Sequence, residues 1–337
     1  MRQGCLSLKK TLSEVFYLLR EELKFLYILL VIVVVLLLLP IFKVPFYWIR
    51  FITNILLWIG LTESLNIITG YTGRVDFGHV AFFGVGAYTV AISISYGFYW
   101  PIGLVLSGIF ALLLAILIGA PTLRLHGAYF AIATWSFAEA LKQLFNVLRE
   151  TGASYGISVP AILSSIDAYY LILFLTVSSI ITNITIEKHK LGFAFRAIRD
   201  GEIAAATLGV NISKYRLIAF MISALYAGFL GGAYALWINY VYPGDAFAGL
   251  KTDQMFVMLL LGGVGSYLGP IIGATVLLTI LEVLWTYWTE IWYMVFLGTV
   301  IMFIVLLMPQ GIVGLILKRR EFISIRRILR EALIGQS

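Results

Sequence analysis

The chain has 337 residues, of which 61% are hydrophobic and only 12% are charged. Soluble domains carry about 25% charged residues, so this composition excludes an ordinary soluble protein and indicates a polytopic α-helical membrane protein. The net charge of +7 does not indicate binding to nucleic acid, because Lys and Arg gather in the cytoplasmic loops of membrane proteins.

The N-terminal residues 1–24 carry charges of both signs, and no cleavage site follows the first apolar run. We therefore expect a cytoplasmic N-terminal segment over 1–24 and not a secretory signal. The stretch FLYILLVIVVVLLLLPIF, residues 25–42, predicts the first spanning helix. The single cysteine, Cys5, excludes an internal disulfide and a CxxC metal site.

Apolar runs predict a transmembrane domain over 25–317 and a basic cytoplasmic tail over 318–337. The runs lie near 25–42, 51–69, 78–98, 101–120, 127–148, 168–186, 215–237, 254–265, 267–285 and 291–308. The eighth run is too short to cross a bilayer alone and ends in glycines, so it predicts a broken or re-entrant helix packed inside protein. The fold class is therefore all-α integral membrane, a polytopic helical bundle of about ten segments.

The stretch GYTGRVDFGHVAFFGVGAY, residues 70–88, places Arg74, Asp76 and His79 among glycines. An acidic residue before a helix accepts free backbone amides, so Asp76 is expected to cap the next helix or to pair with Arg74. One interpretation is a capped cytoplasmic turn that leads into a tightly packed helix. The other is a direct role in a transport pathway or gate.

Ionisable residues inside spans are costly and are often functional. Glu63, with Asn66 on the same span, is the better pathway candidate. Glu139 is a second candidate, but Lys142 lies at i+3 on the same helix and could simply neutralise it. The candidate pathway or gate residues are Glu63, Asn66, Arg74, Asp76, His79, Glu139, Gly262, Gly263 and Gly265. The three histidines have no ligand spacing, so no metal site is expected.

The longest predicted cytoplasmic loop, 187–216, contains apolar residues at helical spacing from Phe195 to Leu208. Gly209 is placed to end this amphipathic helix, and Asn211 is placed to cap the next span. An exposed, half-apolar helix favours a partner groove. The alternative is a helix that lies on the lipid surface or on its own bundle.

Within this loop GEIAAATLG, residues 201–209, resembles the EAA loop of ATP-binding-cassette importer permeases, with one residue inserted after Glu202. The fuller string RAIRDGEIAAATLGVNISKYRLIAF resembles the branched-chain amino acid permease subfamily. So do GYTGRVDFGHVAFFGVGAY, LRLHGAYFAIATWSFAEAL and LLLGGVGSYLGPIIGA. These four ordered blocks cover roughly residues 70 to 275.

The resemblance implies the second of the two permease subunits of a branched-chain amino acid importer, with a type II importer fold, in the cytoplasmic membrane. It implies as partners a homologous second permease, two ATPase subunits at the 187–216 loop and an extracytoplasmic solute-binding protein. The ATPase-coupling residues would be Arg196, Arg199, Glu202, Ala204, Ala205 and Gly209, with Glu202 pairing with a basic group of the ATPase.

The chain has no GxxxxGK[ST] loop, so ATP hydrolysis is assigned to the partner subunits, and no cofactor is expected. The expected substrates are branched-chain or other apolar amino acids. Urea, short amides or another small solute remain alternatives within the same family. An ion-gradient-driven secondary transporter is the alternative from another class; it would work through Glu63 or Glu139 and have no ATPase partner.

Overall fold

The computed structural model describes residues 27, 29–42, 44–125, 127–287, 295, 298–299, 302 and 311–314. The chain divides into two units, 1–50 and 51–337, which we describe separately. In the first unit an apolar helix covers Leu29–Phe42 and ends in the 3₁₀ turn η1, Leu39–Phe42. The predicted N-terminal segment 1–24, the predicted tail 318–337 and most of the tenth apolar run lie outside the described residues.

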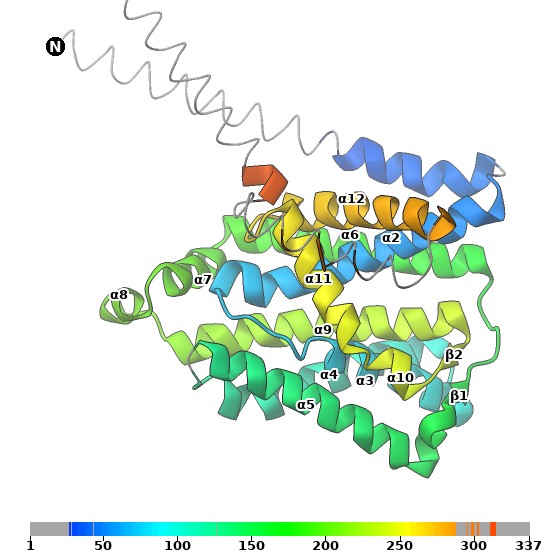
Figure 1. The fold of residues 1–337 in the computed structure, drawn as a ribbon, viewed down its shortest axis with the longest axis horizontal. Coiled ribbons are helices and arrows are strands. Elements are labelled where there is room, and N and C mark those ends of the chain that lie inside the picture. Colours follow the sequence, from blue (N-terminus) through cyan, green and yellow to red (C-terminus); the bar gives the residue numbers. More distant parts are fainter. Residues whose placement is uncertain are drawn as a thin grey trace, which may run out of the picture. The chain divides into compact units, whose positions relative to one another are not determined.

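Helices make up nearly all of the second unit (Figure 1). Four apolar helices among the described residues are long enough to span a bilayer: Phe46–Gly70, Trp100–Thr122, Ser165–Lys188 and Ile212–Ile238. The helices are α2 (Phe46–Leu65, continued by the π-helix η2, Asn66–Gly70), α3 (Val80–Ser95), α4 (Trp100–Thr122), α5 (Ala128–Val147), α6 (Ser165–Lys188), α7 (Lys190–Asp200), α8 (Glu202–Thr207), α9 (Ile212–Ile238), α10 (Pro243–Ala246), α11 (Gly249–Gly262) and α12 (Leu268–Tyr287). The short pieces are η3 (Arg149–Thr151), η4 (Ala153–Tyr155), β1 (Ile157–Ser158) and β2 (Tyr240–Val241), and the two strands pair antiparallel.

The all-α membrane architecture is confirmed, and the eighth run is indeed a short helix. This helix, α11, has 14 residues; it begins at Gly249, earlier than predicted, and ends at Gly262 as the glycines indicate. Gly263 and Gly265 then adopt positive φ angles of 127° and 79°. Glycine reaches these angles without a Cβ clash, so the chain turns sharply from α11 into α12.

Three helices at the centre, α3, α4 and α9, pack directly against one another. A Cβ atom on Gly86 of α3 would overlap the carbonyl of Gly228 on α9, and one on Gly231 would overlap the carbonyl of Phe83. In a bilayer, helices associate through close van der Waals packing because burying apolar surface from lipid gains little. The missing side chains are therefore what allows α3 and α9 to touch at the backbone.

The stretch before α3 differs from the predicted capped cytoplasmic turn. Residues 73–76 form no regular structure, and α3 begins at Val80, not at residue 78 as predicted. His79 contacts Ser64, which precedes Gly70 by six residues on α2 and η2. At 1.5 Å per helical residue, the chain therefore runs back about 9 Å along α2 before α3 begins. Figure 1 shows this re-entrant segment, residues 73–79, as a light-blue coil leading to α3.

The predicted amphipathic helix from Phe195 to Leu208 is also corrected, because two helices, α7 and α8, replace it. They are separated at Gly201, which has an extended backbone and is a poor helix former. The predicted end at Gly209 is confirmed: its φ is 84°, and its N–H and that of Val210 bond to carbonyls of α8. Asn211 caps α9 as predicted, and its side chain accepts the backbone N–H of Lys214 at 3.0 Å.

We expect Gly86→Ala to lower the stability of the protein, because the new methyl group must push α3 away from α9. Overpacking of this kind costs about 1–3 kcal/mol. The measurement is the apparent melting temperature in detergent. The matched control is Gly249→Ala, where the nearest atom to the added Cβ, on Trp135, lies 3.9 Å away. Equal melting temperatures for the two variants would contradict the close-packing argument.

Candidate functional site

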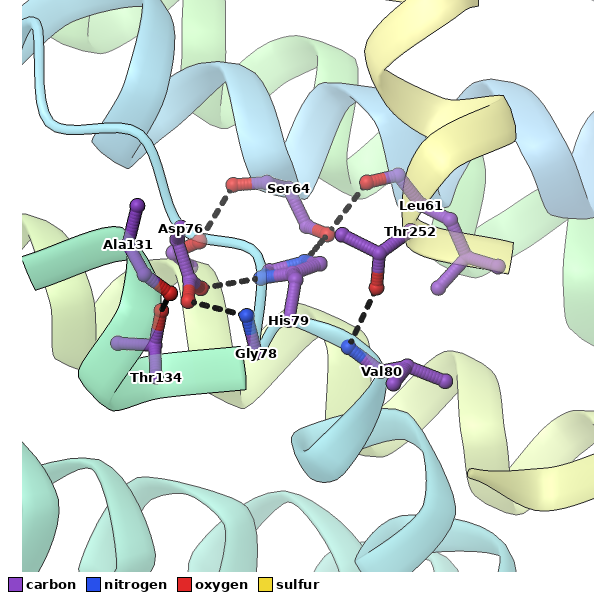
Figure 2. A network of polar contacts seen from close by, with 10 residues as sticks. Leu61, Ser64, Asp76, Gly78, His79, Val80, Ala131, Thr134 and Thr252 are labelled. Carbon is purple, nitrogen blue, oxygen red and sulfur yellow. Dashed lines mark hydrogen bonds and ion pairs between the residues drawn. The ribbon is translucent and has the colours of Figure 1, made fainter. Parts of the chain in front are cut away.

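The re-entrant segment is held by a buried chain of polar side chains, shown in Figure 2. The imidazole of His79 lies between Ser64 and Asp76: its Nε2 is 2.8 Å from the hydroxyl of Ser64 and its Nδ1 is 3.2 Å from Oδ2 of Asp76. All three side chains are fully buried. Val80 N–H donates to the hydroxyl of Thr252 on α11 at 3.2 Å. The network therefore joins α2, α3 and α11 at one place.

The predicted roles of Asp76 are only partly correct. Asp76 does not pair with Arg74, and the first helical turn of α3 has no side-chain cap. Its Oδ1 atom instead accepts the N–H of Gly78 at 3.1 Å, just before the helix, while Oδ2 holds His79. The carboxylate thus orients the turn that leads into α3.

Hydroxyl, imidazole and carboxylate follow one another here in the order of a hydrolase triad. A nucleophile needs a substrate within reach, and Ser64, His79 and Asp76 have no exposed surface. Ser64 also donates to the carbonyl of Leu61 at 2.7 Å. We therefore assign the network to the positioning of helices and not to catalysis.

Asn66, a predicted pathway residue, binds the glycine turn between α11 and α12. Its Oδ1 accepts the N–H of Gly265 at 3.0 Å, and its Nδ2 donates to the carbonyl of Ser266 at 3.2 Å. A Cβ on Gly70 would overlap Asn66. Two predicted candidates that are distant in sequence, Asn66 and Gly265, are therefore in direct contact, and Gly70 leaves the space for it.

The predicted coupling residue Arg199 reaches the same place from α7. Its Nη1 donates to the carbonyl of Gly70 at 2.8 Å, and a Cβ on Gly265 would overlap the same nitrogen. The other arginine of α7, Arg196, donates to the carbonyl of Glu187 at 3.0 Å and lies over the ring of Phe193. The coupling and gate candidates, which were separate groups in the sequence, thus meet at Gly70 and Gly265.

Glu202, at the start of α8, forms ion pairs within its own chain, whereas the sequence predicted a basic group of the ATPase as its partner. Its Oε1 lies 3.1 Å from Arg74 of the re-entrant segment and also forms an ion pair with Arg216 of α9. The side chains of Arg74 and Arg216 are 6% and 5% exposed. Arg74 also donates to the carbonyl of Leu125 at 2.7 Å. Burial lowers the pKa of Arg74 and the charge of Arg216 lowers it further, whereas Glu202 opposes both.

Arg216 was missed by the sequence reasoning. The signal was present, because a basic residue inside an apolar spanning helix is costly and therefore usually has a partner. The sequence alone did not reveal that this partner is Glu202, because Glu202 begins α8 and the position of α8 depends on the break at Gly201.

Most exposed side chains of α8 and of its C-cap residue, Leu208, are apolar. Ile203 and Leu208 are 85% and 81% exposed, and Ala204 is also exposed. Ala205, which was grouped with Ala204 as a docking residue, is buried against the chain itself. We call Ile203, Ala204 and Leu208 the α8 surface. Figure 1 shows α7 and α8 at the end of the bundle where α6 ends and α9 begins.

The remaining pathway candidates have different surroundings. Glu63 is fully buried on α2, and its carboxylate has no hydrogen-bond partner among the described residues. The predicted neutralisation of Glu139 by Lys142 is confirmed, with their charged atoms 3.3 Å apart, and Gln143 donates to Glu139 at 2.9 Å. Glu139 is therefore a paired residue on a partly exposed face of α5.

A cavity of about 1170 Å³ lies beside α11. Its wall is mostly apolar, and three charged residues, Glu187, Arg199 and Asp253, contribute to it. Of the predicted pathway or gate residues, Gly263 and Gly265 line the cavity; Glu63, Asn66, Arg74, Asp76, His79, Glu139 and Gly262 do not. Apart from these two glycines, the predicted gate residues therefore do not line the cavity.

A family model described as the permease component of branched-chain amino acid transport systems matches residues 48–306. The high-affinity branched-chain amino acid transport system permease protein LivM of Salmonella typhimurium is 29% identical, over 77% of this chain and 68% of LivM. The autoinducer 2 import system permease protein LsrC of Enterobacter sp. is 26% identical, over 76% of each chain. The permease protein LivH of Salmonella typhimurium is 29% identical, over 55% of this chain and 59% of LivH. No solved structure matches the chain.

We expect Asn66→Ala to destabilise the junction between η2 and the glycine turn, because the N–H of Gly265 loses its acceptor. A buried unsatisfied group costs about 1–3 kcal/mol. The measurement is the free energy of unfolding in detergent. Asn54→Ala, on the same helix, is the control, since Asn54 is only partly buried and its side chain forms no hydrogen bond with the other described residues. If both variants lower the free energy of unfolding equally, the hydrogen bonds made by Asn66 do not contribute specifically to stability.

Proposed function

The chain belongs to the family of permease components of branched-chain amino acid transport systems, and from this premise we propose that it is the membrane-spanning subunit of an ATP-binding-cassette importer. Its substrates are branched-chain or other apolar amino acids. The observation that carries the proposal is the similarity to LivM over 77% of the chain, combined with an uncovered apolar helix, α8, outside the bundle.

Energy comes from separate ATPase subunits that dock on the α8 surface. A short helix with large apolar side chains in solvent is typical of a docking element. Closure of an ATPase pair moves a docked helix as a rigid body. The contacts of α7, the helix that precedes α8, with the end of η2 and the glycine turn support this route, because a movement of α8 that displaces α7 also displaces Arg199 in the cavity wall.

The other partners follow from the same premise. A homologous second permease completes the translocation unit, and the similarity to both LivM and LivH supports a pair of unlike permeases. An extracytoplasmic solute-binding protein delivers the substrate. The similarity to LsrC supports, as a second candidate, an importer of the same architecture for another small solute.

The test is purification of the tagged chain in mild detergent, followed by uptake in proteoliposomes. We expect a second permease and ATPase subunits to co-purify, and uptake of leucine, isoleucine or valine to require ATP and a binding protein. Competition with urea, short amides and other small solutes identifies the substrate class. Uptake driven by an ion gradient, abolished by ionophores and independent of any ATPase, would replace the proposal with the secondary-transporter alternative.

We expect Ile203→Glu and Leu208→Glu each to lower the co-purification of the ATPase and ATP-driven uptake by about tenfold or more. A charge placed in the centre of an apolar contact loses its water without gaining a partner, and this desolvation is costly. Both positions face solvent in the isolated chain, so the fold should tolerate the change.

The matched control is Ser213→Glu, an exposed position in the first turn of α9, where an acidic residue suits the helix dipole. It introduces the same charge a few residues away and should leave docking unchanged. Full uptake by Ile203→Glu and Leu208→Glu would remove α8 from the docking surface.

A further inference from the structure

We propose that Glu202 is a positioning residue that works inside the permease: with Arg74 and Arg216 it forms a strut that carries motion of α8 to the re-entrant segment. The proposal rests on the proposed function above, because it assumes that an ATPase moves α8. It differs from the expectation that Glu202 serves mainly to bind a basic group of that ATPase.

Three separate elements contribute one residue each to the strut. Glu202 begins α8, Arg74 lies in the re-entrant segment, and Arg216 lies in α9. The carboxylate pairs with both guanidinium groups, at 3.1 Å for Arg74. Because both arginines are almost completely buried, their positions are set by the packing of the bundle. The strut therefore anchors a short, outlying helix to two interior points.

Electrostatics makes this anchor stiff. Among the described residues, the ion pairs of both guanidinium groups go to this one carboxylate. Withdrawal of Glu202 would leave two like charges close together in surroundings with little water, and an unpaired buried charge is strongly destabilising. Movement of α8 away from Arg74 and Arg216 is thus opposed, and α8 must move together with them.

The strut leads on to the buried network. Arg74 is two residues before Asp76, and Asp76 holds His79, which is bonded to Ser64 of α2 and immediately precedes α3. Arg74 also holds the carbonyl of Leu125, in the connection from α4 to α5. A displacement of α8 therefore reaches α2, the start of α3 and the connection between α4 and α5.

The different exposure of Glu202 and Arg74 allows a role of Glu202 in the strut to be distinguished from direct binding of a partner. Glu202 is partly exposed, so a partner could also touch it, but the side chain of Arg74 is 6% exposed and lies out of a partner's reach. If Glu202 served only the ATPase, loss of Arg74 would leave coupling unchanged. If the strut transmits motion, loss of Arg74 must impair coupling as much as loss of Glu202.

The experiment measures substrate transported per ATP hydrolysed in proteoliposomes that contain the complete importer. The variants are Arg74→Gln, Glu202→Gln, their double variant and the conservative Glu202→Asp. We expect each of the two single Gln variants to lower this ratio about tenfold while the ATPase still co-purifies. The double variant should be no worse than Glu202→Gln, because residues acting as one unit are not additive. Glu202→Asp should recover most of the ratio.

The control is Lys214→Gln, which removes an exposed cation near Arg216 and should leave the ratio unchanged. Arg74→Gln keeps the pair of Glu202 and Arg216, so it remains informative even if Glu202→Gln does not fold. A wild-type ratio in Arg74→Gln, together with loss of the ATPase from Glu202→Gln, would overturn the strut and assign Glu202 to the partner. Absence of any ATPase from the wild-type complex would instead refute the proposed function itself.

Discussion

A charge buried inside a membrane protein persists only if another group of the protein compensates it, and this constraint organises the described part of the chain. Arg74, Asp76 and His79 lie on a segment without regular structure that runs back between the helices. Each has a specific partner: Glu202 for Arg74, His79 for Asp76, and Ser64 for His79. Without these pairs the segment could not stay inside the bundle, and α3 would have no fixed starting point.

Glycine residues also make this interior possible, because they leave space for close contacts between helices. Gly86 lets α3 touch α9, and Gly70 leaves space for Asn66 to bind the turn after α11. The glycines and the paired charges therefore act together. The glycines bring backbones into contact, and the paired charges satisfy polar groups that lipid cannot satisfy. The result is a junction where η2, α7 and the glycine turn meet within hydrogen-bonding distance.

This junction gives the proposed permease a physical link between its docking helix and its cavity. Arg199 lies on α7, the helix that precedes α8. It contacts the carbonyl of Gly70 and also lines the cavity, so one side chain belongs to both the junction and the cavity wall. Glu202 ties α8 to the interior by a second route. An importer driven from outside the membrane domain needs such contacts, because coupling between distant sites travels through packed and bonded groups. The buried Glu63 is not explained by these links.

The sequence by itself determined the helical membrane class, the short α11, the helix end at Gly209, the cap at Asn211 and the family. These features depend on composition, hydrophobic length and local backbone chemistry, all of which can be read within a few residues. Only the tertiary structure decided that Arg74 pairs with Glu202 and not with Asp76, that Asn66 meets Gly265, and that Ala205 faces inward. Those contacts join residues far apart in the chain, and their partners depend on where the break at Gly201 and the return of residues 73–79 place each backbone. Long-range pairing of this kind leaves no periodic pattern in the sequence. The sequence therefore predicted a partner subunit as the contact of Glu202, whereas the structure places Glu202 between Arg74 and Arg216 of its own chain.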